Sequence, residues 1–152
     1  MKHIVFGDIT AASTGIILHG CNAQSVMGSG LAYQVKKKWP VVFTDYCHML
    51  KTGKPPINHL GCVAFTAVSA ELVVASGITQ CSYGTNGKYV SYKAIQKCFN
   101  ETIEFAKSTG LEIHYPLIGA GLGGGEWSII SNIIDACFDP YPGIKHTLWI
   151  TE

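Results

Sequence analysis

The sequence predicts an α/β sandwich, in which helices cover both faces of one sheet. Short runs rich in Ile, Val and Leu alternate with longer segments whose apolar residues recur every three or four positions. Strands that alternate with helices are typical of a sheet buried on both faces. At 152 residues the chain is long enough for one domain, which we expect to span 1–152, and too short for two of ordinary size.

The first third of the chain predicts two strands, a glycine-rich loop and two short helices. Each strand is an apolar run that ends at glycine or polar residues, the second near residues 19–22. The first helix ends before Pro40, because proline cannot continue a helix. The expected elements are strands at His3–Phe6 and Gly15–Leu18, a loop at Ala23–Gly30, and helices at Leu31–Trp39 and Val42–Leu50.

The rest of the chain predicts a strand pair, a long helix, a strand, a helix and a last strand. The strand pair, Gly61–Ala67 and Leu72–Ile78, is separated by a short turn near Ser69-Ala70, which favours antiparallel pairing. The long helix ends at Gly110 and carries Tyr92, Ile95, Phe99, Ile103 and Ala106 on one face. The other expected elements are Leu111–Tyr115, Trp127–Phe138 with Ile129, Ile130, Ile133, Ile134 and Cys137 inward, and His146–Ile150.

The composition excludes two classes of protein. With 47% hydrophobic residues, 14% charged residues and a net charge of +1, the chain is neither typical of a disordered segment nor of a protein that binds nucleic acid through bulk positive charge. All 11 basic residues are lysines, so no guanidinium can clamp a phosphate with two parallel hydrogen bonds. Backbone amides must therefore do most of any phosphate binding.

The six cysteines form no C-x-x-C pair, and no Cys or His cluster has the spacing of a zinc site. The chain starts without the apolar region of a signal peptide, and no run approaches the ~20 apolar residues that span a bilayer. We expect a reduced, cytoplasmic protein without a membrane contact, a metal or a cofactor, and we expect a monomer.

Two glycine-rich loops lie between an expected strand and an expected helix, at residues 25–30 and 118–125. Open α/β sheets bind ligands at the carboxyl ends of their strands, and glycines there let the backbone approach a phosphate closely. The second loop comes near a dinucleotide fingerprint, but it lies late in the chain and no acidic residue ends a following strand. Neither loop ends in the Gly-Lys-Ser or Gly-Lys-Thr of a Walker motif.

Four ordered motifs resemble the macrodomains, a family that binds ADP-ribose. They are Gly7-Asp8-Ile9, His19-Gly20-Cys21-Asn22, Met27-Gly28-Ser29-Gly30-Leu31-Ala32, and Ile118-Gly119-Ala120-Gly121-Leu122-Gly123-Gly124. The motif His-x-Cys-Asn, followed by Gly-x-Gly-Leu-Ala-Tyr-Gln, is most similar to the motifs of the ADP-ribose 1''-phosphate phosphatase branch. The resemblance implies a three-layer α/β/α sandwich with a mixed, mostly parallel sheet, and a ligand site built from all four motifs.

Carried over to this chain, the resemblance places Asp8 and the amide of Ile9 on the adenine and Asn22 on the distal ribose. The two glycine loops would surround the diphosphate and the terminal phosphate. These residue types fit, because a carboxylate accepts from an exocyclic amine and a carboxamide both donates to and accepts from hydroxyls. The alternatives are a turn cap before Thr10 for Asp8 and an Asx-turn for Asn22.

His19 and Glu126 are the expected catalytic residues. We expect His19 to end its strand at the rim, where it could protonate the leaving ribose oxygen or orient the attacking water. Glu126, at the mouth of the second loop, could act as a general base. The alternatives are a structural histidine and an acid that complements a helix N-terminus. Cys21 is near His19, which raises the possibility of Cys-His catalysis; the alternative is a buried thiol without a catalytic role.

The sequence departs at one position from the macrodomains that remove ADP-ribose from glutamate, and this departure argues against their mechanism here. Macrodomains that reverse glutamate-linked ADP-ribosylation use a Lys and an Asp, and Gly123 stands at the position of that Asp. Tyr83 and Lys88, in the loop of residues 83–88, either cover the ligand or lie in a solvated loop. Three functions remain: an ADP-ribose 1''-phosphate phosphatase, an ADP-ribosyl hydrolase acting on protein or nucleic acid, and an ADP-ribose reader without activity.

Overall fold

The computed structural model describes residues 2–84, 87 and 89–151. The strands are β1 (Lys2–Phe6), β2 (Gly15–Cys21), β3 (Val63–Ala67), β4 (Leu72–Ile78), β5 (Ile113–Tyr115) and β6 (His146–Ile150). The helices are α1 (Gly30–Lys38), α2 (Pro40–Met49), α3 (Tyr92–Thr109) and α4 (Trp127–Phe138), with short 3-10 turns at Ile9–Ala11 and Pro56–His59.

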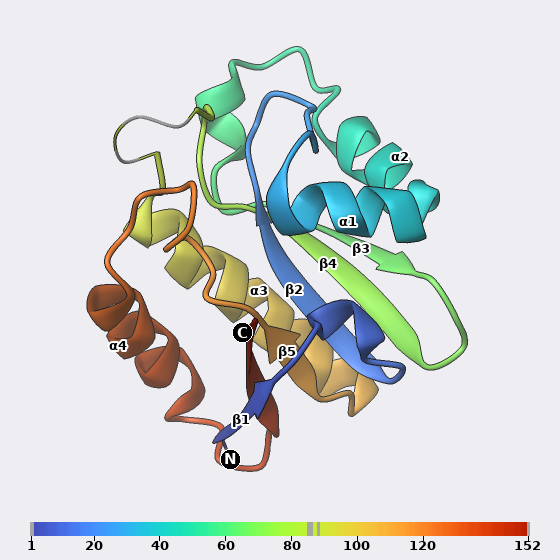
Figure 1. The fold of residues 1–152 in the computed structure, drawn as a ribbon, viewed down its shortest axis with the longest axis vertical. Helices are drawn as coiled ribbons and strands as arrows, with labels where there is room; N and C mark the ends of the chain where they lie inside the picture. Colours follow the sequence, from blue (N-terminus) through green and yellow to red (C-terminus); the bar gives the residue numbers. More distant parts are fainter. Residues whose placement is uncertain (1, 85–86, 88, 152) are drawn as a thin grey trace.

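The six strands form one mixed sheet in the order β1-β6-β5-β2-β4-β3 (Figure 1). Every neighbouring pair is parallel except β3 and β4, which are antiparallel as the short turn between them predicts. Helices lie on both faces of the sheet, so the predicted three-layer α/β/α sandwich with a mostly parallel sheet is confirmed.

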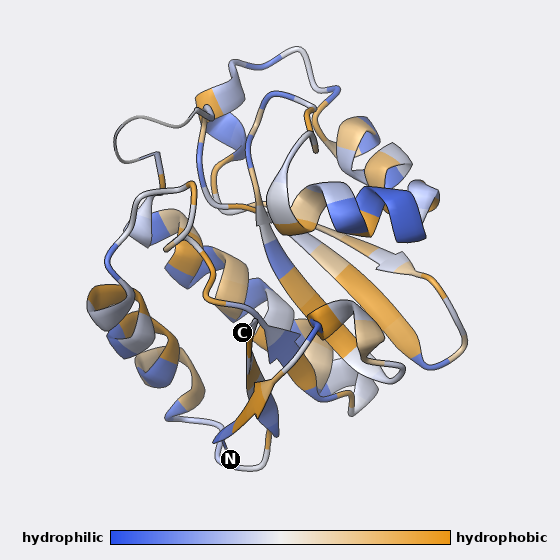
Figure 2. Ribbon diagram, in the orientation of Figure 1, coloured by the Kyte–Doolittle hydropathy of each residue, from blue (hydrophilic) through white to orange (hydrophobic). Residues whose placement is uncertain are grey.

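Each face of the sheet has its own core. On one face, α3 and α4 pack over Ile16 and Leu18 of β2. On the other face, α1 and α2 pack over Cys21 of β2 and Val74 and Ile78 of β4. Figure 2 shows the apolar residues concentrated along β2 and β4, with the hydrophilic end of α1 turned outward. A fully buried aliphatic or aromatic side chain contributes about 1.5–3 kcal/mol, so these two cores account for much of the stability.

Local signals explain where α3 begins and ends. The hydroxyl of Ser91 accepts a hydrogen bond from the amide of Ala94 at 3.1 Å and so caps the first turn. Gly110 ends the helix in the left-handed conformation, with φ of 74°. The face expected to be buried is buried at Ile95, Phe99, Ile103 and Ala106.

Four expected boundaries are wrong by two residues or more, and one expected burial is wrong. β2 runs on from Leu18 to Cys21, because the pairing with β4 continues to the Cys21–Ile78 pair. β3 begins at Val63 and β5 at Ile113, two residues later than expected in each case. α2 begins at Pro40, two residues earlier than expected, because proline is tolerated in the first turn of a helix. Ile129, expected to face inward, is 41% exposed near the start of α4. Within the described residues, no helix is both long and apolar enough to span a bilayer.

Candidate functional site

The topology places both glycine loops at one crevice. β2 and β5 are neighbours, and the chain leaves β2 for α1 on one face and β5 for α4 on the other. Two adjacent parallel strands whose connections go to opposite faces open a crevice at their carboxyl ends, where α/β proteins bind ligands. The first glycine loop (residues 25–30) follows β2, and the second (residues 118–125) follows β5.

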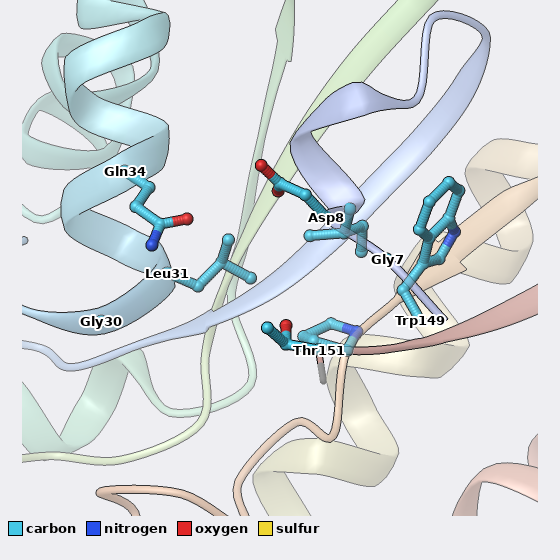
Figure 3. A pocket seen from close by; sticks show the side chains of 9 residues that line it. Gly7, Asp8, Gly30, Leu31, Gln34, Trp149 and Thr151 are labelled. Carbon is cyan, nitrogen blue, oxygen red and sulfur yellow. The ribbon is translucent and has the colours of Figure 1, made fainter. Parts of the chain in front are cut away.

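A cavity of about 160 Å³, here called the rim cavity, lies beside this crevice. Its lining comes from the carboxyl ends of β1, β5 and β6 and from the start of α1, as Gly7, Asp8, Ile9, Gly30, Leu31, Gln34, Pro116, Trp149 and Thr151. Figure 3 shows Leu31 and Gln34 of α1 facing Asp8 and Thr151 from the other side. The walls are apolar at Ile9, Leu31 and Trp149, whereas Asp8 and Gln34 supply polar atoms.

Asp8 lines the rim cavity and also caps the turn that follows it. Its Oδ1 accepts hydrogen bonds from the amide of Thr10 at 2.9 Å and from the hydroxyl of Thr10 at 2.7 Å. These bonds hold the pKa of the Asp8 carboxyl below its ordinary value. Because both bonds use Oδ1, the second carboxylate oxygen is left to accept from a ligand.

Asn22 forms an Asx-turn, which was the alternative to ribose binding. Its Oδ1 accepts from the amide of Gln24 at 2.8 Å, and its Nδ2 donates to the carbonyl of Val26 at 2.9 Å. The hydroxyl of Tyr46 lies 2.9 Å from the same Oδ1. The carboxamide therefore shapes the loop after β2, and only the remaining Nδ2 hydrogen is left for a ligand.

The expected position of His19 is wrong. The residue lies inside β2 and not at its end, and its side chain is 1% exposed. Its Nε2 lies 2.8 Å from the hydroxyl of Ser76 on β4, and burial lowers its pKa to about 4. A side chain enclosed in this way does not contact a ligand at the rim, so the structure favours a structural role.

The other residues of the second motif also lie within the sheet. Cys21 is buried under α1 and α2, and burial raises the pKa of its thiol. Its neighbour Gly20 faces the other side of the sheet, where an added Cβ would lie 2.8 Å from the hydroxyl of Thr79 and 3.2 Å from the side chain of Ile118. Gly20 thus lets β2 approach the start of the second glycine loop.

The first glycine loop presents backbone at the start of α1. Met27 is buried beneath the helix, whereas Gly28, Ser29 and Gly30 are exposed. The first amides of an α-helix have no hydrogen-bond partner within the helix. In α1 these are the amides of Gly30, Leu31 and Ala32. These donors, at the positive end of the helix dipole, suit a phosphate.

The second glycine loop is tightly fixed by its own backbone. The amide of Gly125 donates to the carbonyl of Gly119 at 2.8 Å, and the amide of Gly124 donates to Gly121 at 3.0 Å. Gly119 has φ of +79°, and an added Cβ would lie 2.8 Å from the side chain of Ile95. The loop runs from buried Ile118 through half-buried Ala120 to exposed Leu122.

Three consecutive amides of this loop, those of Gly121, Leu122 and Gly123, have no acceptor among the described residues. Gly121 and Leu122 are exposed, whereas Gly123 is buried. Glu126, exposed at the loop mouth, is the residue before α4, and its side chain does not cap the helix. The site therefore pairs free backbone donors with one carboxylate at a helix N-terminus.

The segment after β4 hydrogen-bonds to the chain just after β2 and to the second glycine loop. The amide of Ala23 donates to the carbonyl of Cys81 at 3.2 Å, and the amides of Tyr89 and Val90 donate to the carbonyl of Gly123 at 2.7 and 3.0 Å. Tyr83 of this segment is 53% exposed. Lys88 lies outside the described residues.

Gln34, Pro116, Trp149 and Thr151 line the rim cavity but were missed by sequence reasoning. Two signals could have found most of them. Gln34 lies three residues after Leu31, and therefore on the same helix face. Trp149 and Thr151 lie at the carboxyl end of the last parallel strand, the position that identified the other motifs.

Comparisons with known proteins agree with this architecture. The Macro domain family model matches residues 18–134. An uncharacterized 17.5 kDa protein of Enterobacteria phage T4, from the tk-vs intergenic region, is 33% identical over 85% of this chain and 84% of its own length. A DNA ADP-ribosyl transferase-DNA ADP-ribosyl glycohydrolase fusion protein of Thermosipho africanus is 30% identical over 86% of this chain.

The chain spans 37% of that fusion protein and 40% of the DNA ADP-ribosyl glycohydrolase of Mycobacterium tuberculosis, to which it is 23% identical over 94% of its own length. A solved structure of a macrodomain protein from Streptomyces coelicolor is 29% identical and superposes with a TM-score of 0.80 over 98% of both chains. A protein from Bacteroides thetaiotaomicron superposes with a TM-score of 0.87, at 28% identity and over 99% of this chain and 98% of that chain.

Proposed function

Since the chain belongs to the Macro domain family, we propose that it binds ADP-ribose with the adenine in the rim cavity and the diphosphate between the two glycine loops. One observation carries this proposal: Gly30 and Leu31 line the rim cavity and also open α1. A ligand can therefore place a base in the cavity and a phosphate on the helix amides without a gap between them.

The polar atoms of the rim cavity suit adenine. The free carboxylate oxygen of Asp8 can accept from the exocyclic amine, while Ile9 and Leu31 contact the faces of the ring. An aspartate is ordinarily ionised at neutral pH, and the bonds from Thr10 lower the pKa of Asp8 further. The chain has no arginine, so the diphosphate would be held by the amides of α1 and of residues 121–123.

We propose further that the protein is a hydrolase acting at the distal ribose, with ADP-ribose 1''-phosphate as substrate. A water oxygen attacks phosphorus, the bond from phosphorus to the C1'' oxygen breaks, and ADP-ribose and inorganic phosphate leave. The free amides of residues 121–123 would stabilise the charge that gathers on the phosphate oxygens. Glu126 would take the proton from the water and return one to the leaving oxygen. His19 is given no part because it is buried.

The relatives favour a second candidate, an ADP-ribosyl hydrolase acting on nucleic acid. Relatives that match 86% and 94% of this chain are named for DNA ADP-ribosyl glycohydrolase activity. In that reaction the bond between C1'' and the DNA would break, and water would supply the new C1'' hydroxyl. The binding site for the ADP-ribose part would be the same, so the leaving group distinguishes the two candidates.

We also propose that the protein is a monomer and works in the cytoplasm. All six cysteines are free, which suits a reducing compartment. Size-exclusion chromatography with light scattering would test the oligomeric state.

The deciding experiment measures binding and turnover on one preparation. We expect ADP-ribose to bind in isothermal titration and inorganic phosphate to be released from ADP-ribose 1''-phosphate. Release of ADP-ribose from an ADP-ribosylated DNA oligonucleotide, without phosphate release, would replace the first activity by the second. Binding with neither activity would indicate a reader, and no binding would refute the proposed site.

Glu126→Gln tests the proposed base. We expect turnover to fall at least about 100-fold with an unchanged dissociation constant for ADP-ribose, because one general base contributes about 10²–10⁴-fold. Glu101→Gln, at an exposed position of α3, is the matched control. If Glu126→Gln keeps full turnover, Glu126 only complements the N-terminus of α4.

A further inference from the structure

Three hydrogen-bonded groups run from the rim cavity across β5 to the bend before β2. The indole Nε1 of Trp149 donates to Nδ1 of His114 at 3.0 Å. On the other side of the same imidazole, Nε2 lies 2.9 Å from the carbonyl oxygen of Thr14. His114 is buried in β5, and Trp149 is two residues beyond the β6 partner of His114, so both side chains lie on the α1 face of the sheet.

Of the three hydrogen-bonded groups, the indole of Trp149 is the one that contacts the rim cavity. Its side chain lines the rim cavity (Figure 3). It also lies beneath the segment that carries Asp8, because a Cβ added at Gly7 would be 3.7 Å from the indole ring. A change in the orientation of the indole would therefore alter the cavity wall and the backbone next to Asp8.

The partners of His114 fix its tautomer. A backbone carbonyl only accepts hydrogen bonds, so Nε2 carries the proton that it donates to Thr14. An indole nitrogen only donates, so Nδ1 must be unprotonated to accept from Trp149. The observed geometry therefore requires neutral His114 with its proton on Nε2.

Protonation of His114 would break this arrangement. A proton on Nδ1 would face the indole N–H of Trp149, and two donors cannot share a hydrogen bond. Two charged groups act on the imidazole. Glu112 Oε1 lies 3.2 Å from Nε2 and favours the charged ring, whereas Lys145, which lies 3.8 Å from Glu112 Oε2, disfavours it. Burial disfavours it most and lowers the pKa of His114, so the ring is neutral at pH 7.

We propose that His114 is a positioning residue for the ligand site: its neutral form holds Trp149 against the rim cavity, and its protonation releases Trp149 and weakens ligand binding. This inference rests on the proposed function only in taking ADP-ribose as the ligand. His114 touches no ligand itself and acts through the indole.

The first test is the pH dependence of ADP-ribose binding between about pH 5 and pH 8. The dissociation constant of the unmodified protein should be constant at the upper end and rise about tenfold for each pH unit below the pKa of His114. His114→Asn keeps an acceptor near the position of Nδ1 and has no proton to gain. We expect this variant to bind within about threefold of the unmodified protein at about pH 8, with a flat profile below.

Two further variants separate positioning from a general loss of stability. His114→Leu removes the acceptor, so its binding should be weak at every pH. His146→Asn is the matched control, because His146 is a buried histidine of β6 that pairs with the hydroxyl of Tyr115 on the other face and does not line the cavity. It should keep the pH profile of the unmodified protein. If His114→Asn retains that profile as well, the proposal is wrong.

The second test uses no ligand, so it stands even if ADP-ribose does not bind. The chain has three tryptophans, whose indole N–H resonances can be followed by NMR. We expect the resonance of Trp149 to move with the titration of His114 and to become insensitive to pH in His114→Asn. If the indole resonance moves but ADP-ribose does not bind, ADP-ribose is not the ligand, and the coupling between His114 and Trp149 still holds. A resonance that does not move would refute the coupling.

Discussion

The hydroxyl of Tyr46 lies 2.7 Å from the carbonyl oxygen of Asn22 and 2.9 Å from its Oδ1. The same hydroxyl accepts a hydrogen bond from the amide of Val26 at 3.3 Å. Tyr46 is fully buried in α2, so a helix far from β2 in the sequence fixes the start of the first glycine loop. The shape of the loop thus depends on the docking of α2.

Tyr46→Phe should loosen this loop. Loss of the hydroxyl removes the partner of the half-buried Asn22 carbonyl and of the half-buried Val26 amide, which costs about 1–3 kcal/mol. We expect the free energy of unfolding in urea to fall by that amount and ADP-ribose affinity to fall with it. Tyr33→Phe, at a tyrosine that is 45% exposed, should leave the free energy of unfolding unchanged. Equal stability of the two variants would contradict the role given to Tyr46.

Gly119→Ala should destabilise the protein, whereas Gly121→Ala should not. An alanine at 119 would have to adopt a backbone φ of +79°, and its Cβ would press on the side chains of Ile95 and Val90. Together these effects cost about 2 kcal/mol or more. At Gly121 an added Cβ meets no atom within 4 Å, so the change should stay within about 0.5 kcal/mol.

Ligand titration on the same pair separates folding from binding. Gly121→Ala should fold normally and bind ADP-ribose more weakly, because its Cβ crowds the backbone that approaches the phosphate. Normal binding by Gly121→Ala would mean that the phosphate does not lie against Gly121.

Stability should fall in acid because His19 is buried neutral. Burial lowers its pKa from 6.5 to about 4, so between these values the unfolded chain binds a proton that the folded chain does not. The contribution is fully present above pH 6.5 and is lost as the pH falls toward 4. We expect a loss of about 3 kcal/mol in urea unfolding from this residue. The His19→Asn variant should be less stable at neutral pH, and its free energy of unfolding should fall less steeply as the pH is lowered. If this variant loses stability with pH as steeply as the unmodified protein, His19 is not the residue responsible.

Asp8→Asn should weaken base recognition without unfolding the turn. An asparagine Oδ1 can still accept from Thr10, so the turn cap is kept. The carboxylate is lost, and we expect ADP-ribose to bind about tenfold more weakly. The preference for adenine over hypoxanthine, measured with inosine diphosphate ribose, should also shrink. Asp139→Asn, at an exposed residue after α4, is the control. Unchanged affinity in Asp8→Asn would leave Asp8 with the role of a turn cap alone.

Strong local patterns predicted most of the fold. α4, β4 and β6 have the expected boundaries because their apolar periodicity is sharp and breakers flank them. The end of β2 was missed because Gly20 reads locally as a breaker, whereas pairing of His19 with Ser76 and Cys21 with Ile78 extends the strand. Such pairing depends on a partner more than 50 residues away and is invisible in a local pattern.

The candidate site was predicted at the level of backbone and less well at the level of side chains. Glycine loops at strand ends follow from local composition, so both loops are where the sequence places them. The bonds of Asp8 and Asn22 within their own turns were foreseen only as alternatives. The contact between Trp149 and His114 joins two strands and could not be read from either segment alone.

The pairing of β1 with β6 has a consequence for biosynthesis. Within the described residues β1 hydrogen-bonds to no other strand, and β6 begins only at His146. Until residues from 146 onward have been added, β1 has no strand to pair with and the wall formed by Trp149 does not yet exist, although Ile9 can already pack against Ile17 and Leu72. The rim cavity is therefore complete only after β6 has been synthesised, so a ligand that needs all of its walls cannot bind while the earlier elements fold.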